Sequence, residues 1–330
     1  MGYRRNTVKY LVTGGAGFIG ATVATMLMEA GHEVVVIDDC SRNSQRFVPA
    51  GAKLVRKRVH EVADVLDSSF DGVLHFAGLI AAGESVEFPE RFWDNNAVGT
   101  LVLLETMRKS GVRKLVFSSS AGVYGNPESV PITEDAATNP VNAYSYTKLS
   151  CDMAIASEAV AHGLAAASLR YFNVAGAYRD KQGTWRGENH EPETHLIPIA
   201  LEVAAGKRDK LAIFGDDYPT PDGTCVRDYI HVADLAQAHL LALDHVEAGE
   251  HRVYNLGSGT GYSNAQIAQA VARITGREIP VVYTDRRPGD PAELVASSQR
   301  AKSELGWKPT RDSLEQMVGD AWAYYQHTQA

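Results

Sequence analysis

The chain has 330 residues, of which 45% are hydrophobic and 22% are charged, and its formal net charge at pH 7 is −8. This composition is typical of a globular protein with a sizeable core, in one large domain or two smaller ones. The negative charge argues against nucleic acid as a partner, because phosphate backbones bind basic surfaces. Since no apolar run approaches the roughly 20 residues that cross a bilayer, we expect no membrane partner either.

The N-terminal stretch MGYRRNTVKYLVTGG leads directly into a strand-like run and has no apolar core of a signal peptide. The three cysteines, Cys40, Cys151 and Cys225, are isolated and lack Cys-x-x-Cys spacing. This pattern fits a reducing compartment, so we predict a cytoplasmic protein without a disulfide framework or zinc site. The eleven histidines show no His-x-His or His-x-x-x-His pair, and we expect no metal centre.

Strand-length apolar runs alternate with helical patterns through the first half of the chain. The expected strands lie at 9–14, 33–38, 72–78, 114–120 and 167–173, and the clearest expected helices at 18–31 and 90–111. This alternation predicts a doubly wound parallel sheet of the Rossmann type, an α/β fold with right-handed crossovers.

The pattern changes after residue 173, where long polar and turn-rich segments appear. Residues 225–258 return to a strand followed by a helix, and a helix from Asn264 to Gly276, a strand at 279–284 and a closing helix follow. We therefore predict a nucleotide-binding domain over 1–173, with a return segment at about 225–258. Residues 174–330 are expected to form mainly a smaller α/β substrate domain.

A glycine-rich turn, TGGAGFIG at 13–20, follows the first expected strand and opens the first helix. Gly14 permits a tight turn, Gly17 permits close approach of a pyrophosphate, and Gly20 permits close helix packing. The second strand ends at Asp38, where a carboxylate would bond ribose hydroxyls and would repel a 2′-phosphate. This favours NAD over NADP, although Arg42 lies close to that position. The alternative is a structural turn followed by a capping aspartate.

The stretch NAYSYTKLS at 142–150 contains two tyrosines and a lysine. A tyrosine is a weak base unless a cation within about 4–6 Å favours its phenolate form. Tyr144 and Lys148 share a helix face at i and i+4, whereas Tyr146 faces elsewhere. We therefore predict Tyr144 as a base tuned by Lys148; the alternative is an ordinary surface helix.

The spacing Gly-x-x-Gly-x-x-Gly, the motif HFAG at 75–78 and the Tyr-x-x-x-Lys pair resemble the extended short-chain dehydrogenase/reductase superfamily. Longer matches, such as FSSSAGVYG, LRYFNVAGA and IFGDDYPTPDGTCVRDYIHVADLA, resemble the UDP-glucose 4-epimerase family over nearly the whole chain. The resemblance implies an NAD cofactor. It assigns that cofactor to Gly14, Gly17, Phe18, Ile19, Gly20, Asp38, Phe76, Ala77, Gly78, Asn95, Ser118, Tyr144, Lys148 and Tyr171.

The same resemblance implies that Tyr144 is the catalytic base and that Lys148 supports it. Ser120 is expected to bond the reacting sugar hydroxyl and to pass the proton of that hydroxyl to or from Tyr144. The UDP-sugar is assigned to Ser120, Tyr144, Asn173, His195, Leu196, Arg227, Arg287, Asp290 and Leu294. The two arginines also fit on chemical grounds, because guanidinium groups bind phosphate oxygens as a fork. The alternative for each arginine alone is a surface ion pair.

Two positions depart from the family pattern: Arg58 stands where an adenine-contacting aspartate is usual, and Ile80 where many members carry a lysine. The expected activity is inversion of a UDP-hexose at C4 through a 4-keto sugar, in an isomerase that is a homodimer joined by helices near 92–110 and 144–162. One alternative is a 4,6-dehydratase, but Ser120-Ala121 lacks the acid that expels water. A second alternative is a non-catalytic NAD-sensing module. The enzyme could also act on UDP-N-acetylhexosamines, because Leu294 stands where some members of the family carry a bulkier tyrosine that narrows the sugar pocket.

Overall fold

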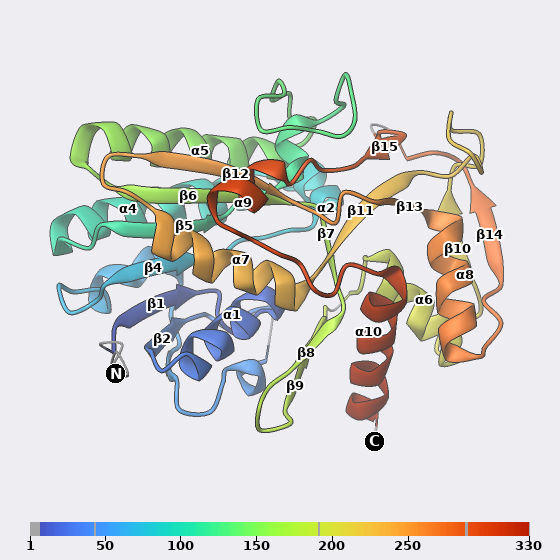
Figure 1. Ribbon diagram of the computed structural model, residues 1–330, viewed down its shortest axis with the longest axis horizontal. Coiled ribbons are helices and arrows are strands. Elements are labelled where there is room, and N and C mark those ends of the chain that lie inside the picture. Colours follow the sequence, from blue (N-terminus) through green and yellow to red (C-terminus); the bar gives the residue numbers. More distant parts are fainter. Residues whose placement is uncertain (1–6, 43, 191, 288–289, 330) are drawn as a thin grey trace. The chain divides into compact units, whose positions relative to one another are not determined.

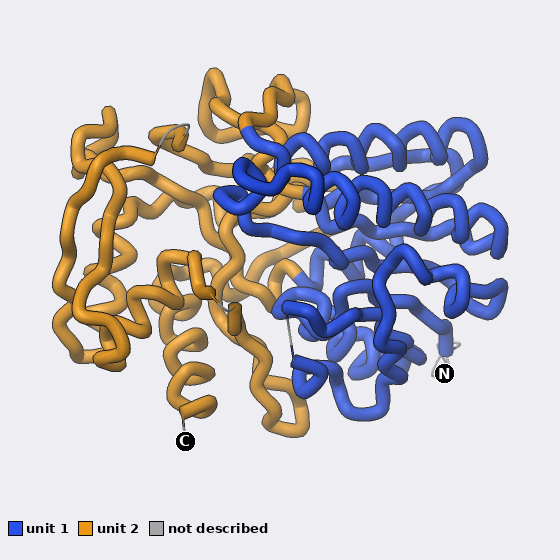
Figure 2. The backbone as a smooth tube through the Cα atoms, turned by 180° about the vertical axis from the view of Figure 1, so that it is seen from behind, with its two compact units in different colours: residues 1–119, 142–169, 236–253 blue, residues 120–141, 170–235, 254–330 orange. Residues whose placement is uncertain are grey.

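The computed structural model describes residues 7–42, 44–190, 192–287 and 290–329. The chain divides into two compact units that interleave along the sequence (Figure 2). Unit 1 contains residues 1–119, 142–169 and 236–253, and unit 2 contains residues 120–141, 170–235 and 254–330. These boundaries differ from the predicted ones. The return segment is shorter because β11 (Val226–His231) pairs with β7 (Asn173–Ala175), a strand of unit 2.

The central sheet has seven strands in the order β12-β6-β5-β4-β1-β2-β3, and Figure 1 labels those from β12 to β2. Their bounds are β1 Lys9–Thr13, β2 Glu33–Ile37, β3 Lys53–Val55, β4 Gly72–His75, β5 Lys114–Ser118, β6 Ala165–Tyr171 and β12 His251–Leu256. Strands β1 to β6 pair in parallel. The strand order reverses between β1 and β4, and such a switch point is where open parallel sheets bind ligands. The predicted Rossmann-type fold is confirmed.

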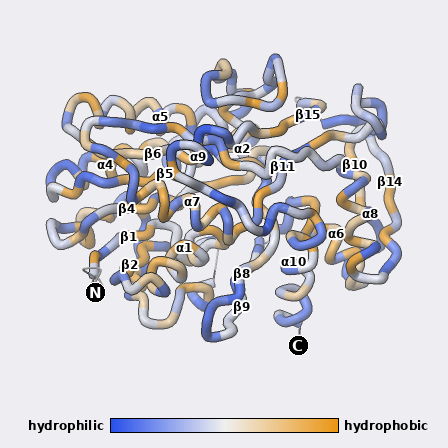
Figure 3. Tube along the Cα trace, viewed as in Figure 1, coloured by the Kyte–Doolittle hydropathy of each residue, from blue (hydrophilic) through white to orange (hydrophobic). Residues whose placement is uncertain are grey.

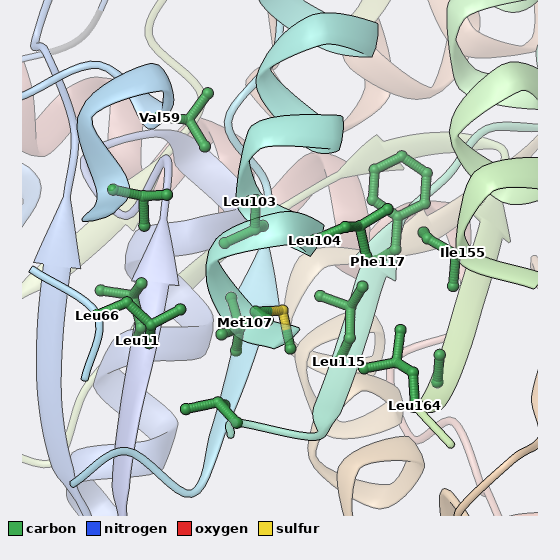
Figure 4. Packing of buried hydrophobic residues seen from close by; sticks show 14 of the residues in the cluster. Leu11, Val59, Leu66, Leu103, Leu104, Met107, Leu115, Phe117, Ile155 and Leu164 are labelled. Carbon is green, nitrogen blue, oxygen red and sulfur yellow. The ribbon is translucent and has the colours of Figure 1, made fainter. Parts of the chain in front are cut away.

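Apolar side chains from the strands and from one layer of helices form the core of unit 1. Strands β1, β2, β4 and β5 are coloured toward the hydrophobic end in Figure 3. Figure 4 shows Leu103 and Met107 of α4 (Gly99–Ser110) and Ile155 of α5 (Ala143–His162) packed over Leu11 and Leu115. Each such buried side chain stabilises the fold by about 1.5–3 kcal/mol. Helices α1 (Phe18–Glu29) and α7 (Val232–His245) cover the other face (Figure 1).

The helix predicted at 90–111 is interrupted. It consists of α3 (Pro89–Phe92), a π-helical segment at Trp93–Val98 and α4, which is capped at its C-terminal end by Gly111. A π-helical segment is rare and frequently lies at a functional site. This segment carries the buried Asn96. Helix α5 begins where the Asn142 side chain caps Ser145 N at 2.9 Å, and this cap fixes the start of the segment that carries Tyr144.

Unit 2 contains a sheet of β13 (Gly261–Ser263), β11 and β15 (Glu293–Leu294), with β7 beside β11. Helices α6 (Leu196–Ala204), α8 (Asn264–Thr275) and α10 (Leu314–Gln329) form a second core. The other elements are η1 Gln45–Phe47, η2 Val59–Asp64, α2 Ala82–Glu87, η4 Ala121–Tyr124, β8 Ala177–Arg179, β9 Trp185–Gly187, β10 Leu211–Phe214, β14 Val281–Thr284 and α9 Gln299–Glu304. Among the described helices, none combines the length and the apolar character that crossing a membrane requires.

Candidate active site

The glycine-rich turn is packed so tightly that two of its positions exclude a side chain. Gly14 has φ +69°, and a Cβ there would lie 2.6 Å from Ala77 N. A Cβ on Gly20 would collide with the Gly14 carbonyl oxygen. Gly17 is the N-cap of α1 and provides no capping side chain, and the first turn of α1 contains no acidic residue. The amides of Phe18 and Ile19 therefore open the helix without a side-chain acceptor, which suits a phosphate group.

Asp38 is buried directly after β2, and its two carboxylate oxygens hold the backbone around it. Oδ2 accepts from Ala16 N at 3.0 Å and Oδ1 accepts from Cys40 N at 2.8 Å. Burial raises the pKa of the Asp38 carboxyl, although these two hydrogen bonds oppose the rise. The carboxylate thus ties the end of β2 to the glycine-rich turn. Arg42, whose place near Asp38 in the sequence counted against the predicted preference for NAD, forms an ion pair with Glu84 at 2.9 Å.

The segment after β4 passes directly beside the reactive helix. A Cβ on Gly78 would lie 3.2 Å from Asn96 Oδ1 and 3.6 Å from Lys148 Nζ. The Asn96 side chain accepts from Leu79 N at 2.7 Å and donates to Leu79 O at 3.0 Å. It therefore fixes the loop next to Lys148. The predicted Asn95 is only half-buried.

Phe76 and Ala77 of the HFAG segment are also held by neighbours from unit 1. The Phe76 ring lies against the His239 ring, with centroids 4.8 Å apart. The Ala77 amide donates to Thr13 Oγ1 at 3.3 Å. These contacts join the exits of β1 and β4 at the switch point of the sheet.

Lys148 is the buried cation of the site. It is 3% exposed, its Nζ donates to Ser118 O at 2.7 Å, and it lies 5.9 Å from the centre of the Tyr144 ring. Burial lowers the pKa of Lys148, and the charges of Cys151 and Asp152 partly oppose this effect. Tyr146, by contrast, is 48% exposed. The fold thus pairs Lys148 with Tyr144 and leaves Tyr146 at the surface.

The three serines at the end of β5 have different partners. Ser118 is buried and provides the carbonyl that holds Lys148. The Ser119 hydroxyl donates to Asp152 Oδ2 at 3.1 Å. Ser120 belongs to unit 2, and its Oγ accepts from Gly122 N at 3.1 Å as the cap of η4. Because this bond uses Ser120 Oγ as an acceptor, the hydroxyl keeps its ability to donate a proton.

Unit 2 brings several of the predicted substrate residues together. Arg227 on β11 is paired in register with Leu294 on β15, and its Nη2 lies 3.7 Å from Asp290 Oδ1. Asn173 on β7 donates to the backbone oxygen of Asp228 at 3.3 Å, beside Arg227. Asn173, Arg227, Asp290 and Leu294 therefore lie on neighbouring segments of one small sheet.

The remaining residues that were predicted to bind substrate are held by partners that the sequence did not indicate. The exposed Arg287 guanidinium lies 3.8 Å from the centre of the Phe214 ring at the end of β10. His195 precedes Leu196, the first residue of α6, and its Nδ1 lies 2.6 Å from Glu188 Oε1. Burial by itself lowers the pKa of His195, but Glu188 and Glu193 raise it to about 10.

Four further side chains were predicted by the motifs or lie close to them in the sequence. Tyr171 is the last residue of β6, and Ile80 is 46% exposed. Arg58 forms an ion pair at 2.7 Å with Asp94, a residue of the π-helical segment. His75, which motif reasoning did not single out, is buried between Thr13 Oγ1 at 2.6 Å and Thr100 Oγ1 at 3.0 Å. Its only signal in the sequence is its place at the end of an expected strand.

The sequence profile of the NAD dependent epimerase/dehydratase family matches residues 10–257. The chain is 54% identical over 319 residues to UDP-glucose 4-epimerase of Corynebacterium glutamicum, across 96% of this chain and 95% of that protein. It resembles the crystal structure of UDP-glucose 4-epimerase from Brucella ovis in complex with NAD, with a TM-score of 0.91, 41% identity and coverage of 97% and 98%. The UDP-glucose 4-epimerase from Bifidobacterium longum in complex with NAD+ and UDP gives a TM-score of 0.91, 37% identity and coverage of 98% and 99%. The resemblance found in the sequence is thereby confirmed, and the chain belongs to the NAD dependent epimerase/dehydratase family.

Proposed function

We propose that this protein is an isomerase that interconverts UDP-glucose and UDP-galactose by NAD-dependent inversion at C4. The observation that carries the proposal is the buried Lys148, which lies beside both Tyr144 and Gly78 at the switch point of the sheet. A buried cation next to a phenol is an arrangement that makes a base of tyrosine near neutral pH. The relatives of this chain carry the same activity in their names.

The residues around the switch point fit NAD. The uncapped start of α1 and the side-chain-free surface of Gly14 suit a pyrophosphate, and the buried Asp38 suits ribose hydroxyls. When bound, NAD supplies a hydride acceptor that takes hydrogen from C4 of the sugar and returns it. Lys148 and the backbone at Gly78 would hold the nicotinamide end.

The protein residues then move the proton and hold the sugar. Tyr144 removes the proton from O4 while C4 is oxidised, which gives a 4-keto sugar, and Ser120 relays that proton. The hexose turns about its diphosphate, so that the hydride would return to the other face of C4 while O4 takes back its proton. Inversion therefore needs a firm hold on UDP and a loose hold on the hexose.

The assigned UDP residues have the chemistry for a firm hold. Arg227 and Arg287 can bind diphosphate oxygens as forks, and each is already restrained, by Asp290 and by the Phe214 ring. The other contacts that we propose come from Asn173, His195, Leu196 and Leu294.

Two alternative functions can be distinguished from the proposed one by the product that the protein forms from a UDP-sugar. A 4,6-dehydratase would need an acid at the sequence positions that Ser120 and Ala121 fill, and neither residue is acidic; Ser120 caps η4. A non-catalytic NAD-sensing module would not need the buried Lys148 beside Tyr144. Activity on UDP-N-acetylhexosamines depends on the room that Leu294 leaves beside Arg227.

The test is incubation of the protein with UDP-galactose and, separately, with UDP-N-acetylgalactosamine, with the products identified by NMR. We expect UDP-glucose from the first. A 4-keto-6-deoxy sugar would indicate the dehydratase, and the absence of any product would overturn the proposed activity. Formation of UDP-N-acetylglucosamine in the second incubation would add the N-acetylated substrates.

We further propose that the protein is a homodimer that works in the cytoplasm. Supporting the dimer, α5 exposes Tyr146, Met153 and Val160 seven residues apart, and Leu101 on the packed helix α4 is 53% exposed. Exposed apolar side chains in such a row are typical of an interface. Supporting the compartment, all three cysteines are free thiols.

A further inference from the structure

Two histidines and two glutamates from the described residues between β9 and α6 lie close together. Glu188, His190, Glu193 and His195 each direct one donor atom into the same space, and these atoms all lie within 4.8 Å of one another. The spacing is Glu-x-His-x-x-Glu-x-His, which differs from the histidine pairs that the sequence search considered. All four residues belong to unit 2.

The separations between these donor atoms run from 2.6 to 3.8 Å, which brackets the spacing of donors around a small metal ion. Glu188 Oε1 lies 3.2 Å from His190 Nδ1 and 2.6 Å from His195 Nδ1. Glu193 lies 3.8 Å from His190 Nδ1 through Oε2 and 3.3 Å from His195 Nδ1 through Oε1. In a tetrahedral zinc site with bonds of about 2.0–2.1 Å, neighbouring donors are about 3.3 Å apart.

The orientation of the two histidine Nδ1 atoms distinguishes a metal site from a set of ion pairs. Both Nδ1 atoms are buried, and within the described residues neither makes a hydrogen bond of acceptable direction, despite the nearby carboxylates. An N–H···O bond requires the hydrogen to point at the oxygen, whereas ligands of a shared ion point past one another toward a common centre. The two Nδ1 atoms therefore fit a shared ion better than they fit two ion pairs.

The surroundings hold the ligands in place. The Glu193 side chain is only 5% exposed, and its Oε1 accepts from Thr194 N and His195 N at 2.7 and 2.8 Å. The Glu188 side chain is 10% exposed. The His195 side chain is 43% exposed although its Nδ1 is buried, so the exposed part is the opposite edge of the ring.

We propose that Glu188, His190, Glu193 and His195 bind one divalent first-row transition metal ion, with Zn²⁺ as the representative ion. Two imidazoles and two carboxylates favour zinc and its neighbours over Mg²⁺ and Ca²⁺, which prefer oxygen ligands alone. The ion would neutralise two buried carboxylates and would fix the His195 ring through Nδ1. The site stands apart from the hydride chemistry, and its test does not depend on activity.

The test is Zn²⁺ binding by the EDTA-treated full-length protein, measured by isothermal titration calorimetry and by metal content after gel filtration. We expect one Zn²⁺ per chain in the wild type, and an affinity at least about 100-fold lower in His190→Asn, which removes a ligand outside the proposed substrate residues. Asn189→Ala, an exposed change in the same loop, should bind as the wild type does. His327→Asn, which removes an exposed histidine of α10, should also bind normally.

Thermal unfolding provides the second measurement. The metal-free His190→Asn variant should unfold near the temperature of the metal-free wild type, and Zn²⁺ should raise that temperature in the wild type alone. Absence of stoichiometric Zn²⁺ in the wild type would overturn the site. Equal binding by the wild type and His190→Asn would also overturn it, because the ion would then lie elsewhere.

Discussion

Gly14 has to be glycine for two separate reasons, its backbone conformation and the lack of space for a side chain. Its positive φ is a backbone conformation that costs other residues about 1–2 kcal/mol, and its missing side chain lets the backbone at Phe76 and Ala77 approach. Gly111 at the end of α4 shares only the first of these reasons, since its φ is +77° and a Cβ there would meet nothing within 4 Å. The pair therefore separates backbone strain from close packing.

Gly14→Ala should lower the unfolding free energy by more than Gly111→Ala does, because overpacking adds about 1–3 kcal/mol to the strain. It should also weaken NAD binding, whereas Gly111→Ala should bind NAD normally. Urea denaturation and NAD titration measure the two effects. Equal losses of stability together with equal NAD affinity would show that close packing at Gly14 is unimportant.

His75 links protonation to stability. It is 1% exposed between two threonine hydroxyls, and burial, with a smaller contribution from the Lys148 charge, lowers its pKa from 6.5 to about 3. The unfolded chain therefore binds a proton that the folded protein does not bind between those pH values. Because the folded pKa is depressed, this stability is fully present above pH 6.5 and is lost as the pH falls toward 3.

In urea denaturation between pH 7.5 and 4.5, the unfolding free energy of the wild type should fall with pH below about 6.5. His75 contributes up to about 1.4 kcal/mol per pH unit to that slope. His75→Asn should be less stable at pH 7.5, because it loses packing and hydrogen bonds, but should show the shallower slope. Parallel slopes for the two proteins would refute the linkage.

At the scale of elements, helix α5 has two faces with different roles. The inward face carries Lys148 and Ile155, both buried, and the outward face carries Met153 and Val160, which are 64% and 86% exposed. A face this apolar is costly to expose to water, and burial against a second copy in the proposed dimer would remove that cost.

Met153→Asp combined with Val160→Asp should therefore convert a dimer into a monomer of 35.7 kDa in light scattering after gel filtration. A charged residue in an apolar interface loses hydration without a partner. Tyr283→Asp, at a 50% exposed apolar position of β14 in unit 2, should leave the dimer intact. A dimer that survives the double change would exclude this face as the interface.

Among the elements, those with a periodic pattern and an end signal could be predicted from the sequence. Strands β1, β2 and β5 begin where expected, and α1 begins at Phe18 after Gly17. The π-helical segment at Trp93–Val98 could not be predicted, because its apolar pattern is that of a continuous helix. The segment contains the buried Asn96, whose partners, Leu79 and Thr147, lie far away in the sequence.

At the scale of the whole molecule, the sequence predicted the doubly wound sheet but not how the chain is shared between the two units. Residues 120–141 and 225–235 join unit 2, although local periodicity gives no sign of it. Strand β11 joins its unit through pairing with β7, β13 and β15, which are separate in the sequence. Local patterns therefore predict strands, whereas their partners depend on packing over the whole chain.

The residues of the candidate site likewise fall into two groups, those that local sequence patterns predict and those that they do not. Glycines and the Tyr144-Lys148 spacing are local signals, so both were found in the sequence. The carboxylates beside His195 and the Phe214 ring beneath Arg287 were missed, because each contact joins residues whose types are common and whose spacing is not a known motif.

The central claim is that Tyr144, next to Lys148, is the base that takes the proton from the sugar O4. The most direct measurement compares the rate of UDP-galactose conversion in Tyr144→Phe with that in Tyr146→Phe, with bound NAD determined in both proteins. Tyr144→Phe should retain NAD but lose at least about 100-fold in rate, whereas Tyr146→Phe should remain close to the wild type. Near-normal conversion by Tyr144→Phe, with its NAD still bound, would contradict the account.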